Sequence, residues 1–201
     1  MAKANWAIVS PASGSGNKTV NVSSNSEHTG RVARQTTLTI SAANVSSKTV
    51  TVNQAGKPEF VENASDTATA IKGGQTVTIS GKSNSSKLTF SLGTGDLSIT
   101  LPSKYRAGGI DVTNGTAITG DPGATAEYDW SIQFVVDTNT SISEKSKQII
   151  VTDDAGNTDT CILTQAAGDP TLSVSKNSID LTWQGTAVSF DVMSNTSWSI
   201  S

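Results

Sequence analysis

The chain is poor in the residues that cross-link small folds or build catalytic centres. Of its 201 residues one is cysteine and one is histidine, and only 5% are aromatic. The single cysteine, Cys161, excludes an intrachain disulfide, so any core must hold without covalent cross-links. Charged residues make up 15% and the net charge is −3, which gives no basic field for nucleic acid or anionic lipid. We therefore expect neither nucleic acid nor a membrane among its partners.

Long apolar runs are also missing. No stretch approaches the roughly 20 apolar residues that a membrane-spanning helix needs. Residues 1–6 have neither the apolar stretch of a signal peptide nor a cysteine for lipid attachment. These features predict a protein that is made in a cytoplasm and is not exported by the usual route.

No catalytic or metal-binding constellation can be assembled from the residues present. His28 lies in a polar loop and is interpreted as an ordinary loop residue, and Cys161 as a small core hydrophobe. The three acids in residues 153–159 could hold calcium, but the same residue types suit a hairpin turn, which we favour. The sequence predicts a protein that is not an enzyme, with no cofactor and no metal.

What is abundant is Ser, Thr, Val, Asn and Gly, a composition typical of strands and turns. Apolar and polar residues alternate with period two in short runs, which predicts an all-β fold. Four such runs lie before residue 57 and four after residue 168. We expect them to be strands at 6–9, 19–22, 37–40, 49–52, 171–174, 179–182, 188–192 and 198–200.

An internal repeat relates the two ends to the middle of the chain. Setting Gln165 on Gln54 gives an offset of 111 residues, which also places the strand at 37–40 near the apolar run 149–151. The same offset carries the C-terminal residues 185–197 onto 74–86. The middle of the chain therefore contains a whole repeat, while each end contains a part.

This repeat predicts one complete sandwich flanked by two complementary half domains. The N-terminal residues 1–56 are expected to be a closing half and residues 169–201 an opening half. The complete sandwich spans 57–168 with an insertion at 103–129. The shared core of the joined halves is expected to contain Trp6, Ile8, Val192, Trp198 and Ile200.

The halves could meet within one chain or between chains, or the chain could be an excerpt from a longer array. A sandwich with an odd number of strands has its termini at opposite poles, and the linkers near residues 55–58 and 167–170 are short. This geometry favours head-to-tail completion between copies over completion within a chain. Such a contact closes into a ring or continues as a filament.

The sequence of both ends resembles a known family, the BACON domain, a Bacteroidota-associated immunoglobulin-like module. The resemblance lies in residues 6–14, 34–40 and 49–54 for the close of the domain and 172–175 and 190–200 for its opening. The middle departs from the pattern, with Lys87 at the position of Trp198 and an insertion after Pro102. The resemblance implies immunoglobulin-like β-sandwiches throughout.

BACON modules occur in surface glycan-handling proteins and in crAss-like phages. The resemblance therefore implies a structural virion protein, an auxiliary component that decorates the capsid exterior and is made in the host cytoplasm. Its partners would be other copies of itself and the major capsid protein or other virion proteins. The alternative is a glycan-binding module at the bacterial cell surface, with surface glycans as the ligand.

Two further sites are candidates. Tyr105, Arg106 and Tyr128 lie in the insertion and could form a partner-binding loop, because long loops are often functional and Arg and Tyr often anchor interfaces. The alternative is that the insertion packs as extra strands on the sandwich. Trp183, beside a turn, is the best candidate for a glycan platform.

Overall fold

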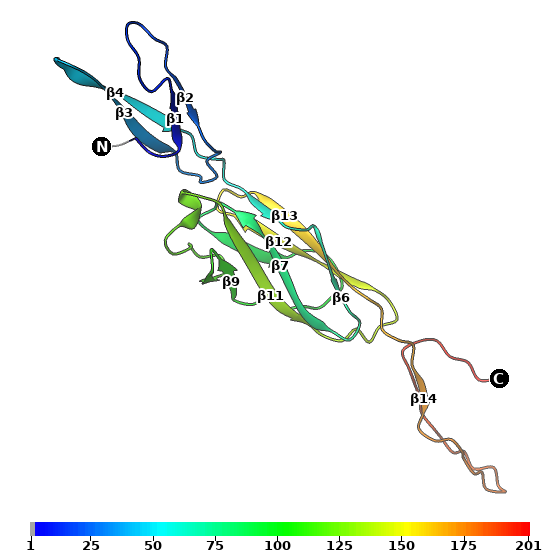
Figure 1. The fold of residues 1–201 in the computed structure, drawn as a ribbon. Helices are drawn as coiled ribbons and strands as arrows, with labels where there is room; N and C mark the ends of the chain where they lie inside the picture. Colours follow the sequence, from blue (N-terminus) through cyan, green and yellow to red (C-terminus); the bar gives the residue numbers. More distant parts are fainter. Residues whose placement is uncertain (1–2) are drawn as a thin grey trace.

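The computed structural model describes residues 3–201 as three parts arranged end to end (Figure 1). Apart from one turn of 3-10 helix, η1 (Pro122–Ala124), every regular element in these residues is a β-strand. The prediction of an all-β fold is confirmed. No helix in the described residues is long and apolar enough to cross a membrane.

The middle part, called here the middle sandwich, consists of the nine strands β5 to β13 in two sheets. One sheet has the order β10-β9-β11-β7-β5 and the other β6-β13-β12-β8. The strands are β5 (Val61–Asn63), β6 (Thr67–Ala70), β7 (Gln75–Ser83), β8 (Leu88–Leu92), β9 (Lys104–Ala107), β10 (Ile110–Thr113), β11 (Tyr128–Val136), β12 (Lys145–Asp153) and β13 (Thr158–Gln165).

Strict alternation along the long strands builds the core of the middle sandwich. Every second residue of β11 is buried, from Tyr128 to Val136, because successive side chains of a strand point to opposite faces. The main hydrophobic cluster of the described residues lies within the middle sandwich. It comprises Val61, Ala70, Val77, Ile79, Leu88, Phe90, Leu97, Tyr105, Ala107, Val112, Ile118, Tyr128, Trp130, Ile132, Phe134, Val136, Ile149, Val151, Cys161 and Leu163.

The parts before and after the middle sandwich are thin two-stranded ribbons. The N-terminal segment (residues 3–56) pairs β1 (Ala7–Ser10) with β2 (Asn21–Ser24) and β3 (Arg34–Ala42) with β4 (Val45–Gln54). The C-terminal segment (residues 169–201) pairs only β14 (Leu172–Val174) with β15 (Val192–Ser194). Figure 1 places these two segments at opposite poles of the middle sandwich.

The β3–β4 pairing repeats the β12–β13 pairing at the offset of 111 residues. Arg34 lies opposite Gln54 in the first hairpin, and Lys145 lies opposite Gln165 in the second. The two hairpins therefore share one register, although only the second lies inside a closed sandwich.

The β14–β15 pairing repeats β5–β7 at the same offset. Leu172 lies opposite Ser194, and Val61 lies opposite Ser83. The first strand pair of the middle sandwich is thus present again in the C-terminal segment, without the sheets that cover it in the middle.

The insertion after Pro102 forms β9, β10 and η1 on the edge of the five-stranded sheet. Tyr105 and Tyr128 are buried: the Leu88 amide donates to the Tyr105 hydroxyl, and the Tyr128 hydroxyl donates to the Ser85 carbonyl oxygen. Buried rings cannot anchor a partner at a surface, which corrects the expectation for these two tyrosines. Of the three candidate residues only Arg106 is exposed.

The core location predicts where truncations are costly. Leu163→Ala removes a fully buried side chain and is expected to lower the free energy of unfolding of the middle sandwich by about 3 kcal/mol. Ile162→Ala, at the neighbouring outward-facing position of the same strand, is expected to cost less than about 1 kcal/mol. Chemical denaturation of both variants measures the difference, and equal losses would contradict this core.

Candidate functional site

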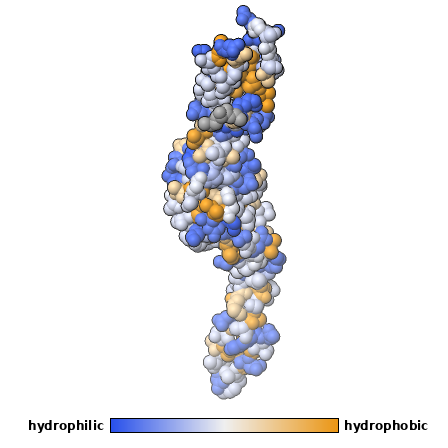
Figure 2. All heavy atoms as spheres, turned by 60° about the vertical axis from the view of Figure 1, so that its left-hand side comes forward, coloured by the Kyte–Doolittle hydropathy of each residue, from blue (hydrophilic) through white to orange (hydrophobic). Residues whose placement is uncertain are grey.

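An open groove of about 900 Å³ lies between the β1–β2 and β3–β4 ribbons of the N-terminal segment. Its apolar lining residues come from all four strands and the loop between the first two. They include Val9, Val20, Val22, Leu38, Ile40 and Val50. In Figure 2 orange residues form a strip along one side of this segment, at the top of the view.

The groove exposes side chains whose counterparts in the middle sandwich are buried. Ile40 is 54% exposed, whereas Val151, at the same position of the β12–β13 hairpin, is 1% exposed. Val50 is 51% exposed, and its counterpart Cys161 is 1% exposed. In the middle sandwich these positions are covered by the facing sheet that contains β5, β7 and β11. The N-terminal segment lacks the equivalents of β5 and β7.

The C-terminal segment has the opposite deficiency. It carries the equivalents of β5 and β7 but nothing that packs on them, and none of its residues is buried. Leu181 is 62% exposed, whereas its counterpart Ala70 is 4% exposed. Its other exposed large apolar residues are Leu172, Val174, Ile179, Trp183, Val188, Phe190, Met193, Trp198 and Ile200. An exposed apolar surface of this extent marks an interaction site.

The residues expected to share one core lie at the two ends of the molecule. Trp6 is half-buried and stacks under the Arg34 guanidinium at 4.7 Å, while Trp198 and Ile200 are exposed. Ile8 is exposed and does not line the groove, and its place in a shared core stays a prediction. Its neighbour Val9 lines the groove instead, because successive side chains of β1 point to opposite faces.

Backbone hydrogen bonds join the N-terminal segment to the middle sandwich. The amides of Arg31 and Val32 donate to the carbonyl oxygens of Gly123 and Ala124, at 2.9 and 3.0 Å. A Cβ on Gly56 would lie 2.0 Å from the Arg31 carbonyl oxygen, so the close approach requires glycine there.

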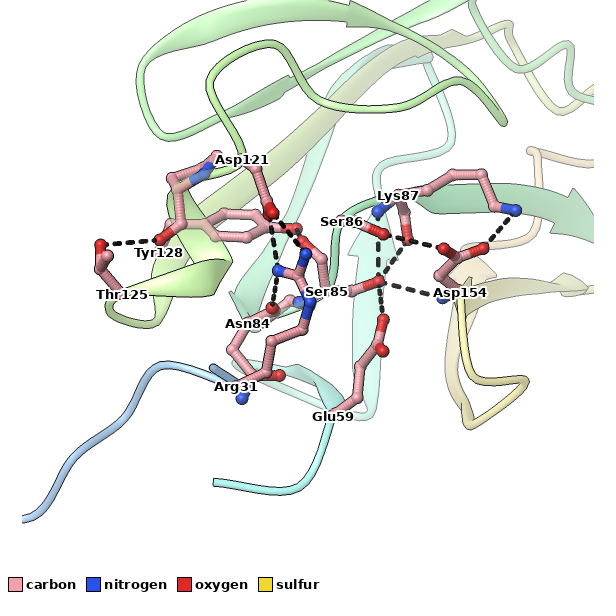
Figure 3. A network of polar contacts seen from close by, with 12 residues as sticks. Arg31, Glu59, Asn84, Ser85, Ser86, Lys87, Asp121, Thr125, Tyr128 and Asp154 are labelled. Carbon is pink, nitrogen blue, oxygen red and sulfur yellow. Dashed lines mark hydrogen bonds and ion pairs between the residues drawn. The ribbon is translucent and has the colours of Figure 1, made fainter. Parts of the chain in front are cut away.

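Side chains complete this joint (Figure 3). The Arg31 guanidinium donates two hydrogen bonds to the Asp121 carboxylate, one of them at 2.6 Å, and a third at 3.2 Å to the Asn84 carbonyl oxygen. A planar guanidinium that binds both oxygens of a carboxylate fixes orientation as well as distance. Lys82 donates to Glu127 at the same joint, and this hydrogen bond lowers the pKa of the Glu127 carboxyl.

Asn84 lies at the centre of the joint and is fully buried. Its Nδ2 donates to the carbonyl oxygens of Thr29, Lys57 and Pro58 at 3.2, 3.3 and 3.2 Å. Its Oδ1 accepts from the Phe60 amide at 3.0 Å. One side chain thereby holds the N-terminal segment, the linker and the start of the middle sandwich together.

Asn195 reproduces this arrangement at the other pole, 111 residues later. Its Nδ2 donates to the carbonyl oxygens of Thr140 and Asp169, both at 2.9 Å. Its Oδ1 accepts from the Thr171 amide at 2.8 Å. The middle sandwich therefore presents two joints of the same design, one to each segment.

The remaining candidate residues have structural surroundings. The His28 ring is buried and its Nε2 lies 2.7 Å from the Val32 carbonyl oxygen. Burial raises the pKa of the Cys161 thiol, as expected for a core residue. Asp153 closes the β12–β13 turn by accepting from the Asn157 amide at 2.8 Å. Trp183 is 92% exposed at its turn, as a glycan platform requires, and that role stays a prediction.

Comparison with known proteins places the N-terminal segment in a family. Residues 1–55 match the family model described as "BACON: Putative binding domain, N-terminal". The chain carries a BACON-type domain. The resemblance stated from the sequence is therefore confirmed for these residues. The groove lies within the BACON match.

The other comparisons add little. No curated protein matches the chain. A protein from Bacteroides thetaiotaomicron solved by NMR aligns at 13% identity over 56% of this chain and 89% of its own, with a TM-score of 0.27. A score this low supports no conclusion on fold or function.

The two asparagine joints differ in burial, which predicts different costs. Asn84→Ala leaves buried carbonyl and amide groups without partners and is expected to lower the free energy of unfolding by about 3 kcal/mol. Asn195→Ala frees groups that water can reach, so the expected loss is below about 1 kcal/mol. Urea denaturation of the two variants measures both values, and equal losses would contradict the assigned role of Asn84.

Proposed function

We propose that this protein is a non-enzymatic, self-assembling structural module. The C-terminal segment of one copy completes the N-terminal BACON-type segment of the next. The observation that carries this proposal is the pair of half-sandwiches with complementary deficiencies at opposite poles of one chain. One half offers the groove between β1–β2 and β3–β4. The other offers uncovered strands whose counterparts in the middle sandwich, β5 and β7, belong to the sheet that covers the β12–β13 hairpin.

Completion between copies is favoured over completion within a chain. The middle sandwich separates the two segments, and each is attached to it by its own joint. The linker between the middle sandwich and the C-terminal segment consists of only a few residues. A chain extends at most about 3.5 Å per residue, so such a linker cannot return the segment past a whole sandwich.

The setting that we propose for such an assembly is the outside of a phage capsid. This setting rests on the resemblance of both chain ends to modules that occur in crAss-like phages. A row of sandwiches held by strand pairing would form an auxiliary layer or projection bound to other virion proteins, without catalytic chemistry.

A second candidate function is glycan binding at a bacterial cell surface. The almost complete exposure of Trp183 favours it, because sugar rings stack on exposed aromatic faces. Trp183→Ala would abolish binding to a glycan array under this second function.

Self-association and its dependence on Phe190 test the first proposal. We expect light scattering after size exclusion to show oligomers that grow with concentration. Phe190→Ala should weaken the association at least about tenfold, because its counterpart Ile79 is buried in the core of the middle sandwich and removing a large buried side chain costs more than about 1.4 kcal/mol. Met193→Ala is the matched control: Met193 is an exposed apolar residue of the same segment, and its counterpart Lys82 lies on the outer face of the middle sandwich. A monomer at all concentrations would refute the proposal.

A further inference from the structure

The middle sandwich supplies a template for how two copies would pair. In it the β12–β13 hairpin is flanked on both edges: β13 pairs with β6 in parallel, and β12 pairs with β8 antiparallel. In the N-terminal segment the same hairpin, β3–β4, has neither neighbour. The equivalents of β6 are residues 178–181, and those of the start of β8 are residues 199–201, at the other end of the chain.

We infer that residues 178–181 of one copy pair in parallel with β4 of the next copy, in the register that β6 and β13 use. This inference rests on the proposed function. In the middle sandwich Ile162 lies opposite Thr67 and Leu163 opposite Ala68. Moved by the 111-residue offset, these pairs become the intermolecular pairs Thr51 opposite Ser178 and Val52 opposite Ile179. Residues 178–181 have no strand partner among residues 3–201 of their own chain.

The offset holds on both sides of residues 178–181. Before them, the β14–β15 register equals the β5–β7 register. After them, the Gly185 amide donates to the Thr182 carbonyl oxygen, as the Gly74 amide donates to Ile71. The two glycines have φ angles of 71° and 81°. Residues 172–194 therefore align with residues 61–83 of the middle sandwich without an insertion.

The apolar pattern of residues 178–181 fits the groove. In the middle sandwich the inward side chains of β6 are Ala68 and Ala70. Their counterparts Ile179 and Leu181 are larger, and both are exposed in the free segment. Val52, which this register places opposite Ile179, is smaller than its counterpart Leu163, and the difference leaves room for a larger donor side chain. Pairing in this register covers the apolar face and satisfies the free backbone groups of β4 together.

The repeated joint makes this assembly an open filament. We call the sandwich formed by the C-terminal segment of one copy (the donor) and the N-terminal segment of the next (the acceptor) the hybrid sandwich. The Asn195 joint connects it to the middle sandwich of the donor, and the Asn84 joint connects it to the middle sandwich of the acceptor. These two joints lie at opposite poles, because the same two joints flank the middle sandwich at opposite poles (Figure 1). Each copy then adds one middle and one hybrid sandwich, and a heterologous contact without a closing rotation continues indefinitely.

The register can be tested by cysteine cross-linking of the full chain. The double variant Thr51→Cys with Ser178→Cys places two outward-facing cysteines opposite each other across the inferred pair. Neighbouring strands bring paired Cα atoms within about 5.5 Å, which suits a disulfide. Under mild oxidation we expect a ladder of covalent oligomers on a non-reducing gel. The native Cys161 is buried and shared by all variants.

Two controls separate register from proximity. Thr51→Cys with Asp180→Cys keeps the same face but shifts the partner by two residues, to beyond the roughly 7 Å that a disulfide spans. We expect at least a tenfold lower yield of cross-links. An equal mixture of the two single variants, Thr51→Cys and Ser178→Cys, is expected to stop at covalent dimers, because each chain then carries one reactive end.

The outcomes distinguish this inference from the proposed function. A cross-linked monomer would show pairing within one chain and overturn the inference. Equal cross-linking of the shifted control, or no cross-linking in a protein that still self-associates, would overturn the register and leave the proposed function standing. Absence of self-association in the reduced protein would overturn both. Electron microscopy of the cross-linked ladder should show unbranched rods, and closed rings would contradict the open filament.

Discussion

The structure depends on one constraint: a two-stranded β-ribbon with an apolar face is not stable without a second layer. The middle sandwich satisfies this constraint within itself, because the inward-facing apolar residues of its two sheets pack against each other. The β3–β4 hairpin has the same register and a similar pattern but faces an open groove. The two hairpins differ in whether a second sheet covers them. The strands equivalent to that sheet, β14 and β15, lie at the opposite end of the chain.

The joints explain why the two halves stay apart. Asn84 and Asn195 each bind carbonyl oxygens on both sides of a linker, so a segment cannot swing freely about the middle sandwich. At the N-terminal joint Arg31 and Asp121 add a charged pair with fixed orientation. The joints thus hold the groove and the uncovered strands at opposite poles of the middle sandwich, where both face outward.

The sequence predicts much of this architecture because period-two alternation and the 111-residue offset are both visible in it. The offset reproduces the β14–β15 pairing in full and the β3–β4 pairing from Arg34 to Ile40, where a bulge shifts the register. It fails where the copies differ in length. The groove residues Val20, just before β2, and Val22, within β2, fall on Ser131 and Gln133 of β11. These two positions of β11 lie between its buried side chains, so the offset is one residue out of phase here. Sequence alone could not place that shift.

The same limit applied to single side chains. Tyr105 and Tyr128 were expected at the surface because they lie in an insertion, yet both fill the core, where burial raises the pKa of each hydroxyl. An insertion predicts extra chain but not the direction of its side chains. Ile8 and Val9 show this on a smaller scale, because two adjacent apolar residues of β1 give no indication of which one faces the groove.

The two candidate functions make competing use of Trp183. In the template its counterpart is Lys72, whose Nζ lies 2.6 Å from Asp169 across the C-terminal joint. The counterpart of Asp169 is Pro58, in the linker of the accepting copy. In the inferred filament the Trp183 ring would therefore lie beside Pro58 of the next copy, where an aromatic ring on proline replaces an exposed ion pair of little energetic value. A tryptophan held in that joint is not free to stack on a sugar. Glycan binding through Trp183 therefore belongs to the free chain, and assembly would suppress it.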